Sequence, residues 1–137
     1  MSKGDFFIQK VKALFSFLVD DNDFKVLNDV LTPNIFYKVS YSDSKIVVSI
    51  SYEDFTENLN ILIYQLADGI ESDYDDRTKT RSLNTLNRLV LPKLGKDDHL
   101  ENSKYFKGIA CDSKLERELL KRAKELRLCF LHSSEWR

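Results

Sequence analysis

The stretch KIVVSISYEDFTENLNILIYQLADG, residues 45–69, contains two patterns that decide the fold. Residues 46–52 alternate apolar side chains with mostly polar ones, which is typical of a strand with one solvated face. After the acidic connection at residues 53–58, nearly every position of 59–66 is apolar. A strand that is apolar on both faces needs cover on both, from a helix of the same chain or from another molecule.

A second alternating segment precedes this stretch. Tyr37, Val39 and Tyr41 fall on one face of a strand, and Ser42-Asp43-Ser44 is a turn sequence that leads into residue 46. The short connections predict three strands in an antiparallel meander, with the third strand on an edge.

Helical spacing marks the segments on either side of the strands. Apolar residues recur on one side of residues 3–19, which predicts an amphipathic helix, and residues 24–31 predict a short helix that ends before Pro33. From Leu83 a further helix runs until Pro92 ends it. We interpret residues 95–108 as a mixed loop.

A long helix closes the chain, with Asp112 or Ser113 as its N-cap. Its inward residues are Leu115, Leu119, Ala123 and Leu126. We therefore expect one α+β domain over residues 1–137: an N-terminal helix, a three-stranded antiparallel meander and two C-terminal helices packed on the sheet. A mixed sheet with an added strand from residues 105–111 is the alternative.

Composition agrees with a compact fold of 137 residues, because 42% of the chain is hydrophobic and 12% aromatic, more than a disordered chain carries. The N-terminus mixes Lys10 and Lys12 into its apolar residues, unlike a secretory signal, so we expect a cytoplasmic protein with no membrane contact. Cys111 and Cys129 are expected to be reduced structural cysteines. The sequence indicates no cofactor and leaves the oligomeric state open.

Charge is distributed unevenly along the chain. Residues 1–76 hold 6 Lys and Arg against 14 Asp and Glu, a net charge of -8, whereas residues 77–137 hold 15 against 8, a net charge of +7. Two interpretations stay open: the halves interleave their charges on folding, or one of them meets a partner of opposite charge.

The strongest candidate binding site is the acidic segment ADGIESDYDDRTK, residues 67–79. Its candidate partner-binding residues are Asp68, Glu71, Asp73, Tyr74, Asp75 and Asp76. A calcium loop that starts at Asp73 would need an oxygen ligand and then a glycine where Arg77 and Thr78 stand, so the segment does not fit a designed metal site. It is a solvated loop or a surface that docks a protein.

Other motifs do not support catalysis. His99 and His132 are the only histidines, and neither lies at a zinc-binding spacing from another ligand. The chain has no nucleophile elbow and no glycine-rich nucleotide loop. We do not expect an enzyme.

The last helix contains the sequence KLERELLKRAKELR, residues 114–127, in which cations alternate with glutamates. The spacing predicts ion pairs of Glu118 with Arg122 and of Lys121 with Glu125. Phosphate binding favours a face free of carboxylates, so nucleic acid is the weaker partner for this helix.

The segments FSFLVDD, NDF and YKVSYSDSKIVVSISYED, with the apolar strand that follows, resemble small α+β immunity proteins of bacterial polymorphic or contact-dependent toxin systems. The likeness covers residues 7–66. It implies a non-enzymatic protein that binds one cognate toxin, often through an acidic surface that occludes a basic active site. It transfers no site residue. We therefore expect an immunity protein that blocks a basic toxin domain, and a nucleic-acid-associated regulator that uses the basic last helix is the alternative.

Overall fold

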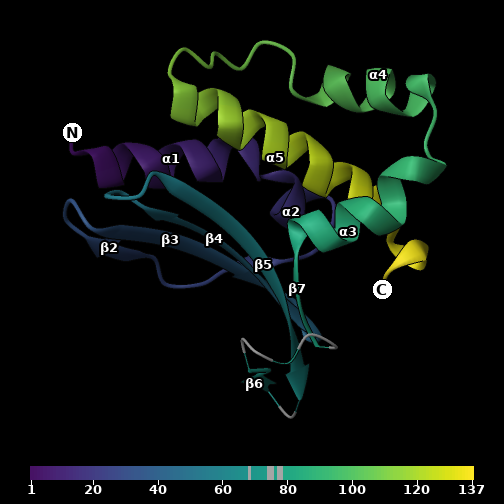
Figure 1. The fold of residues 1–137 in the computed structure, drawn as a ribbon, viewed down its shortest axis with the longest axis horizontal. Helices are drawn as coiled ribbons and strands as arrows, with labels where there is room; N and C mark the ends of the chain where they lie inside the picture. The colour runs from purple at the N-terminus through teal and green to yellow at the C-terminus, as the bar shows by residue number, and fades with distance from the viewer. Residues whose placement is uncertain (68, 74–75, 77–78) are drawn as a thin grey trace. The chain divides into compact units, whose positions relative to one another are not determined.

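The computed structural model describes residues 1–67, 69–73, 76 and 79–137. The chain divides into two compact units, Met1–Ser82 and Leu83–Arg137, and each is described by itself (Figure 1). The first unit holds the sheet with two helices, and the second unit is helical. The α+β class with an antiparallel sheet is confirmed.

The centre of the sheet lies where the alternation predicts it. The strands β3 (Phe36–Ser42), β4 (Ile46–Glu53) and β5 (Asn58–Ala67) are adjacent and antiparallel. In one row across them, Val39 pairs with Ile50 and Ile50 with Ile61, and all three side chains are buried. This row belongs to the core face.

The opposite face is less exposed than its polar side chains predict. Ser40 pairs with Ser49 and Ser49 with Leu62 across the middle of the sheet. Both serines are buried and Leu62 is half-buried. The apolar strand β5 thus has one buried and one half-buried face, in agreement with its sequence pattern.

Among the described residues, the sheet has seven strands rather than the predicted three. β1 (Lys25–Val26) and β2 (Val30–Thr32) both pair with β3, and β6 (Ile70–Glu71) and β7 (Thr80–Ser82) both pair with β5. The third strand of the predicted meander is therefore not an edge strand. The added strands have two or three residues each, too few for a period of two to be recognised.

The helix predicted over residues 24–31 is wrong, because β1 and β2 occupy half of that segment and no residue of it is helical. Among its apolar residues only Phe24 is fully buried, whereas Leu27 and Val30 are exposed. The backbone instead completes hydrogen bonds along β3, including that from Leu27 N to Ser40 O at 2.8 Å. Tertiary pairing outweighs the local spacing of apolar residues here.

The predicted N-terminal helix is divided into α1 (Lys3–Leu14) and α2 (Phe17–Asp20). A continuous helix would place Phe15 and Phe17 about 200° apart around its axis, so it could not bury both on one side. The break allows both rings to be fully buried. Ser2 caps α1, since its Oγ accepts a hydrogen bond from Asp5 N at 3.2 Å.

One face of the sheet is covered by α1, as Figure 1 shows. The ring of Phe7 contacts those of Tyr37 and Tyr52, with both centroid distances 5.8 Å. Lys3 Nζ lies 2.5 Å from Asp54 Oδ1, which fixes the start of the helix at the connection between β4 and β5. Aromatic packing and this ion pair hold the helix on the strands.

The second unit contains α3 (Leu83–Val90), α4 (Lys96–Tyr105) and α5 (Lys114–Leu131), with short 3-10 turns at Leu91–Lys93 and Ser133–Glu135. The C-terminal part of the chain therefore has three α-helices rather than the predicted two. No residue of 105–111 is in a strand, so the alternative mixed sheet is also wrong.

The interpretation of residues 95–108 as a loop is wrong, because most of this segment forms α4. The helix was missed because it lacks an apolar stripe. Asn102 is its only fully buried residue. The helix is held by polar contacts instead: Asn102 Nδ2 donates to Lys124 O at 2.9 Å, and Asn102 Oδ1 accepts from the Arg127 guanidinium at 2.8 Å. Such anchoring to α5 leaves no periodic signal in the sequence.

The helix α5 begins where its sequence predicts. Ser113 Oγ accepts from Glu116 N, and Glu116 Oε1 accepts from Ser113 N, each at 3.1 Å. Leu119, Ala123 and Leu126 are fully buried, as expected.

Candidate functional site

The acidic segment is only partly within the described residues. Glu71, Asp73 and Asp76 are described. The other predicted partner-binding residues, Asp68, Tyr74 and Asp75, lie outside them.

Backbone and hydroxyl hydrogen bonds anchor the described part of the segment. The register pairs Ala67 with Ile70, and Gly69 between them has a φ of 77°, which glycine adopts without steric cost. Beyond β6, Ser72 N donates to Gln65 O at 2.9 Å. The hydroxyls of Ser72 and Thr80 lie 2.8 Å apart.

A second set of contacts fixes the backbone on either side of Asp76. Thr80 Oγ1 donates to Asp73 O at 2.7 Å, and Thr80 N donates to Asp76 O at 2.7 Å. Residues 72–73 are thereby tied to residues 79–80. The described carboxylates of Glu71, Asp73 and Asp76 are carried by a backbone that is hydrogen-bonded to β5 and β7.

The acidic side chains differ in exposure. Glu71 and Asp73 are exposed, and neither carboxylate forms an ion pair with another described residue. Asp76 is half-buried. Two carboxylates are therefore available to a cation brought by a partner.

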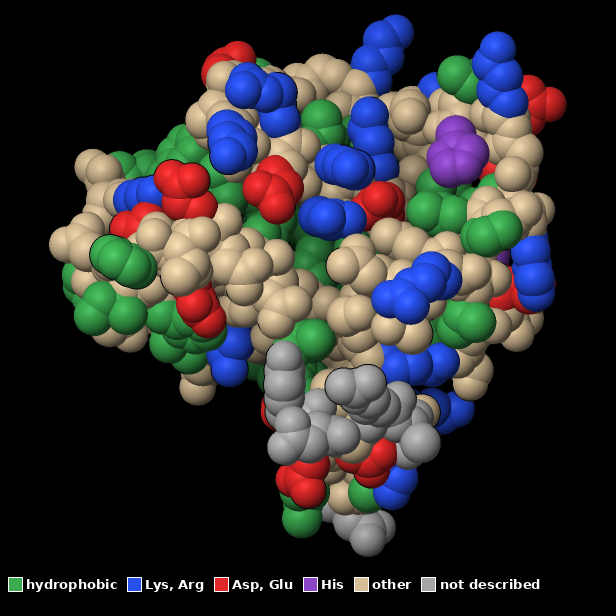
Figure 2. Space-filling view, viewed as in Figure 1, with side chains coloured by type: hydrophobic (Ala, Val, Ile, Leu, Met, Phe, Trp, Pro, Cys, Tyr) green, Lys and Arg blue, Asp and Glu red, His purple; other side chains and the backbone are tan. Residues whose placement is uncertain are grey.

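An apolar residue that sequence reasoning missed lies beside them. Ile70, the first residue of β6, is 71% exposed. Figure 2 shows apolar (green), acidic (red) and basic (blue) side chains together around β6. The signal was present in the sequence as an isoleucine within an acidic segment. Its exposure depends on the pairing of β6 with β5.

A metal site does not form from the described acidic residues. Over the described part of the chain, no group of three or more His, Cys, Asp or Glu side chains is arranged to hold a metal ion. What the described part of the segment offers is the exposed side chain of Ile70 together with the exposed carboxylates of Glu71 and Asp73, which form no ion pair with a described residue.

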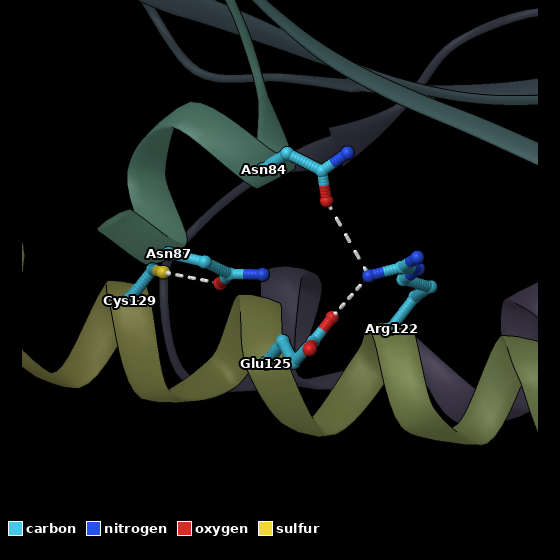
Figure 3. Close-up of polar contacts among 5 residues, drawn as sticks. All are labelled: Asn84, Asn87, Arg122, Glu125 and Cys129. Atoms are coloured by element: carbon cyan, nitrogen blue, oxygen red, sulfur yellow. Dashed lines mark hydrogen bonds and ion pairs between the residues drawn. The ribbon is translucent and has the colours of Figure 1, made fainter. Parts of the chain in front are cut away.

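The two cysteines are free thiols, as expected. Cys129 is fully buried in α5, and its Sγ donates to Asn87 Oδ1 of α3 at 3.6 Å (Figure 3). Burial, with a smaller effect from the charge of Glu125, raises the pKa of this thiol to about 12. It stays protonated at neutral pH and is a poor nucleophile.

The basic side chains of α5 do not form the ion pairs predicted from spacing. Arg122 binds Glu125 at 2.8 Å instead of Glu118, and it also donates to Asn84 Oδ1 at 3.5 Å (Figure 3). Lys121 thereby loses its predicted partner, Glu125.

Arg127 is held in a different way. Its guanidinium lies 4.3 Å from the ring centroid of Tyr105, in addition to its hydrogen bond with Asn102. Arg122 and Arg127 therefore serve the packing of the helical unit.

Comparison of the chain with family models, with curated proteins and with solved structures found no match. Within the described ranges, no helix combines the length and the apolar run that crossing a bilayer requires.

Proposed function

We propose that this protein is a non-enzymatic protein-binding module, and most specifically an immunity protein that blocks the active site of a cognate bacterial toxin. The observation that carries the proposal is the exposed side chain of Ile70, which is followed along the chain by Glu71 and Asp73, two exposed carboxylates that form no ion pair with a described residue. An exposed apolar side chain followed by two exposed carboxylates suits a basic protein surface that has its own apolar pocket.

The anchored backbone supports a protein partner for this segment. Hydrogen bonds from Ser72 and Thr80 hold residues 72–73 before any partner arrives. Less conformational entropy is then lost on binding than in a free loop. Carboxylates also disfavour a nucleic-acid partner at this position, because they repel phosphates.

The proposal predicts a toxin gene immediately upstream of the gene for this protein, and the toxin domain that it encodes is the partner to test. Co-expression of the two should restore growth, and the purified pair should associate more slowly as salt rises, because screening weakens attraction beyond about 8–10 Å. The variant Glu71→Lys/Asp73→Lys should lower the association rate about tenfold or more at low salt, since it reverses the steering charges.

A matched control is Asp20→Lys/Asp21→Lys, which makes the same change in net charge at two exposed residues at the end of α2. It should keep most of the association rate and the protection of growth. Failure of the unmodified protein to protect cells overturns the immunity function. An equal loss of binding in both variants would show that net charge, rather than this segment, controls association.

A second candidate function is nucleic-acid association through α5. It is favoured by Lys121 and Lys124, whose ammonium groups form no ion pair with a described residue. Binding of a 20-nucleotide DNA duplex should then weaken steeply with salt and be lost in Lys121→Gln/Lys124→Gln. No binding at 50 mM salt would exclude this function.

A further inference from the structure

The helical unit contains a pocket between α4 and α5 that the proposed function does not use. Its volume is about 350 Å³, within the range of about 300–1,000 Å³ typical of small-molecule sites. Every lining residue belongs to the second unit, and the lining combines three leucines, two lysines and an arginine with a few other polar side chains.

One part of the lining is apolar. Leu91 and Leu120 are half-buried and Leu128 is buried, and these three leucines come from the turn after α3 and from α5. They offer a surface that an aliphatic chain or a ring would remove from water.

The other part of the lining is cationic. Lys121 and Lys124 form no ion pair with any described residue, and the Arg117 guanidinium donates to a backbone carbonyl, Asp112 O, at 2.6 Å. A backbone carbonyl carries no net charge, so all three positive charges remain uncompensated. Figure 2 shows Lys and Arg side chains (blue) following α5, with apolar side chains (green) between them.

The single carboxylate in the lining does not cancel these charges. Glu125 binds Arg122 at 2.8 Å, and Arg122 is held between Glu125 and Asn84, as the dashed lines of Figure 3 show. Because Glu125 pairs with Arg122, the ion pair of Lys121 with Glu125 that the sequence spacing predicts does not form. Ser103 and His99, both in α4, add a hydroxyl and an imidazole to the wall.

We propose that this pocket binds a small amphiphilic anion, that is, an aliphatic chain or ring that carries one carboxylate, phosphate or sulfonate. The apolar part lies on Leu91, Leu120 and Leu128, and the anionic group binds Lys121 and Lys124. A nucleic-acid strand fits less well, because three leucines line the pocket and the described residues of the lining include no Phe, Tyr or Trp on which a base could stack.

The test compares two fluorescent probes with the full chain. Anilinonaphthalene sulfonate carries a ring system and one negative charge, and N-phenyl-1-naphthylamine is its uncharged counterpart. The unmodified protein should bind one sulfonate probe saturably. Lys121→Gln/Lys124→Gln should weaken sulfonate binding about tenfold or more, the loss expected for one charge-assisted hydrogen bond, and should change binding of the neutral probe less than about twofold.

The matched control is Lys96→Gln/Lys114→Gln, which removes two exposed lysines of α4 and α5 that do not line the pocket. It should leave binding of both probes unchanged. Amide shifts on adding the sulfonate probe should be largest at Ser103 and Leu120. Circular dichroism melts verify that both double variants are folded.

Three results would overturn the proposal. The first is the absence of saturable sulfonate binding by the unmodified protein. The second is an equal effect of the two double variants, or amide shifts centred outside the pocket. The third concerns competition for the bound sulfonate probe by octyl phosphate, a small amphiphilic anion, and by a 20-nucleotide DNA single strand. If the DNA displaces the probe at a lower concentration than octyl phosphate does, the lysines bind nucleic acid instead.

Discussion

The hydroxyl of Tyr41 is a buried polar group with no hydrogen-bond partner among the described residues. Its ring belongs to the core of the first unit, where Tyr41 pairs with Val48 across the sheet. Burial, and to a lesser degree the charge of Asp29, raises the pKa of this phenol. A buried hydroxyl without a partner costs about 1–3 kcal/mol of folding free energy.

Tyr41→Phe should therefore stabilise the protein, by about 1 kcal/mol, because it removes an uncompensated polar atom and keeps the ring. Urea unfolding of both proteins measures the difference. The matched control is Tyr37→Phe, which removes a hydroxyl that lies 3.4 Å from Asp54 Oδ2. That change should be neutral or cost up to about 1 kcal/mol. A loss of stability in Tyr41→Phe that exceeds the loss in Tyr37→Phe would mean that the hydroxyl has a partner, such as an ordered water molecule.

At the scale of elements, the contact of α1 with the sheet depends on a glycine within the helix. Gly4 is buried, and a Cβ atom at this position would lie 2.8 Å from Tyr37 Cε1 and 2.9 Å from Leu31 Cγ. Both neighbours come from strands, β3 and β2. The absence of a side chain lets the helix approach the strands closely.

Gly4→Ala should destabilise the protein by about 1–3 kcal/mol, because the added methyl group overpacks the contact with Tyr37. At an ordinary helix position the same substitution would stabilise the protein, because alanine is favoured over glycine by about 1 kcal/mol. Gln9→Ala introduces alanine at an exposed position of the same helix and should change stability by less than about 0.5 kcal/mol. Thermal melts decide the question, and a Gly4→Ala protein as stable as Gln9→Ala would contradict the close approach.

At the scale of the whole molecule, two buried acids make folding sensitive to alkaline pH. The Cys129 pKa is raised to about 12 from an ordinary 9.0, and the Tyr41 pKa is raised as well. Between pH 9 and 12 the folded chain therefore binds more protons than the unfolded chain. Stability that is fully present below pH 9 is lost as pH rises toward 12, by up to about 1.4 kcal/mol per pH unit for one thiol.

The free energy of unfolding should thus decrease above pH 9, and Cys129→Ser should reduce that slope, because serine keeps a hydroxyl toward Asn87 and does not ionise in this range. Urea titrations at pH 8, 9, 10 and 11 measure the slopes. Cys111→Ser controls for the loss of a cysteine. An unchanged slope in Cys129→Ser would show that its thiol does not contribute.

The sequence by itself determined the α+β class, the three central strands and the last helix. Each of these elements is long enough for its period to appear several times, as in β4, or carries its own cap, as Ser113 does for α5. The acidic composition of residues 68–76 was also evident, although only part of that segment lies within the described residues.

Tertiary structure alone decided the short strands, α4 and the availability of the charges. β1, β2, β6 and β7 are two- or three-residue strands that exist because β3 and β5 offer hydrogen-bonding edges, and α4 is held by the side chain of Asn102 rather than by an apolar stripe. The spacing along α5 predicted an ion pair between Glu125 and Lys121, but in the folded helix Glu125 pairs with Arg122. Local patterns cannot rank such contacts, because they depend on which neighbour the fold brings within reach.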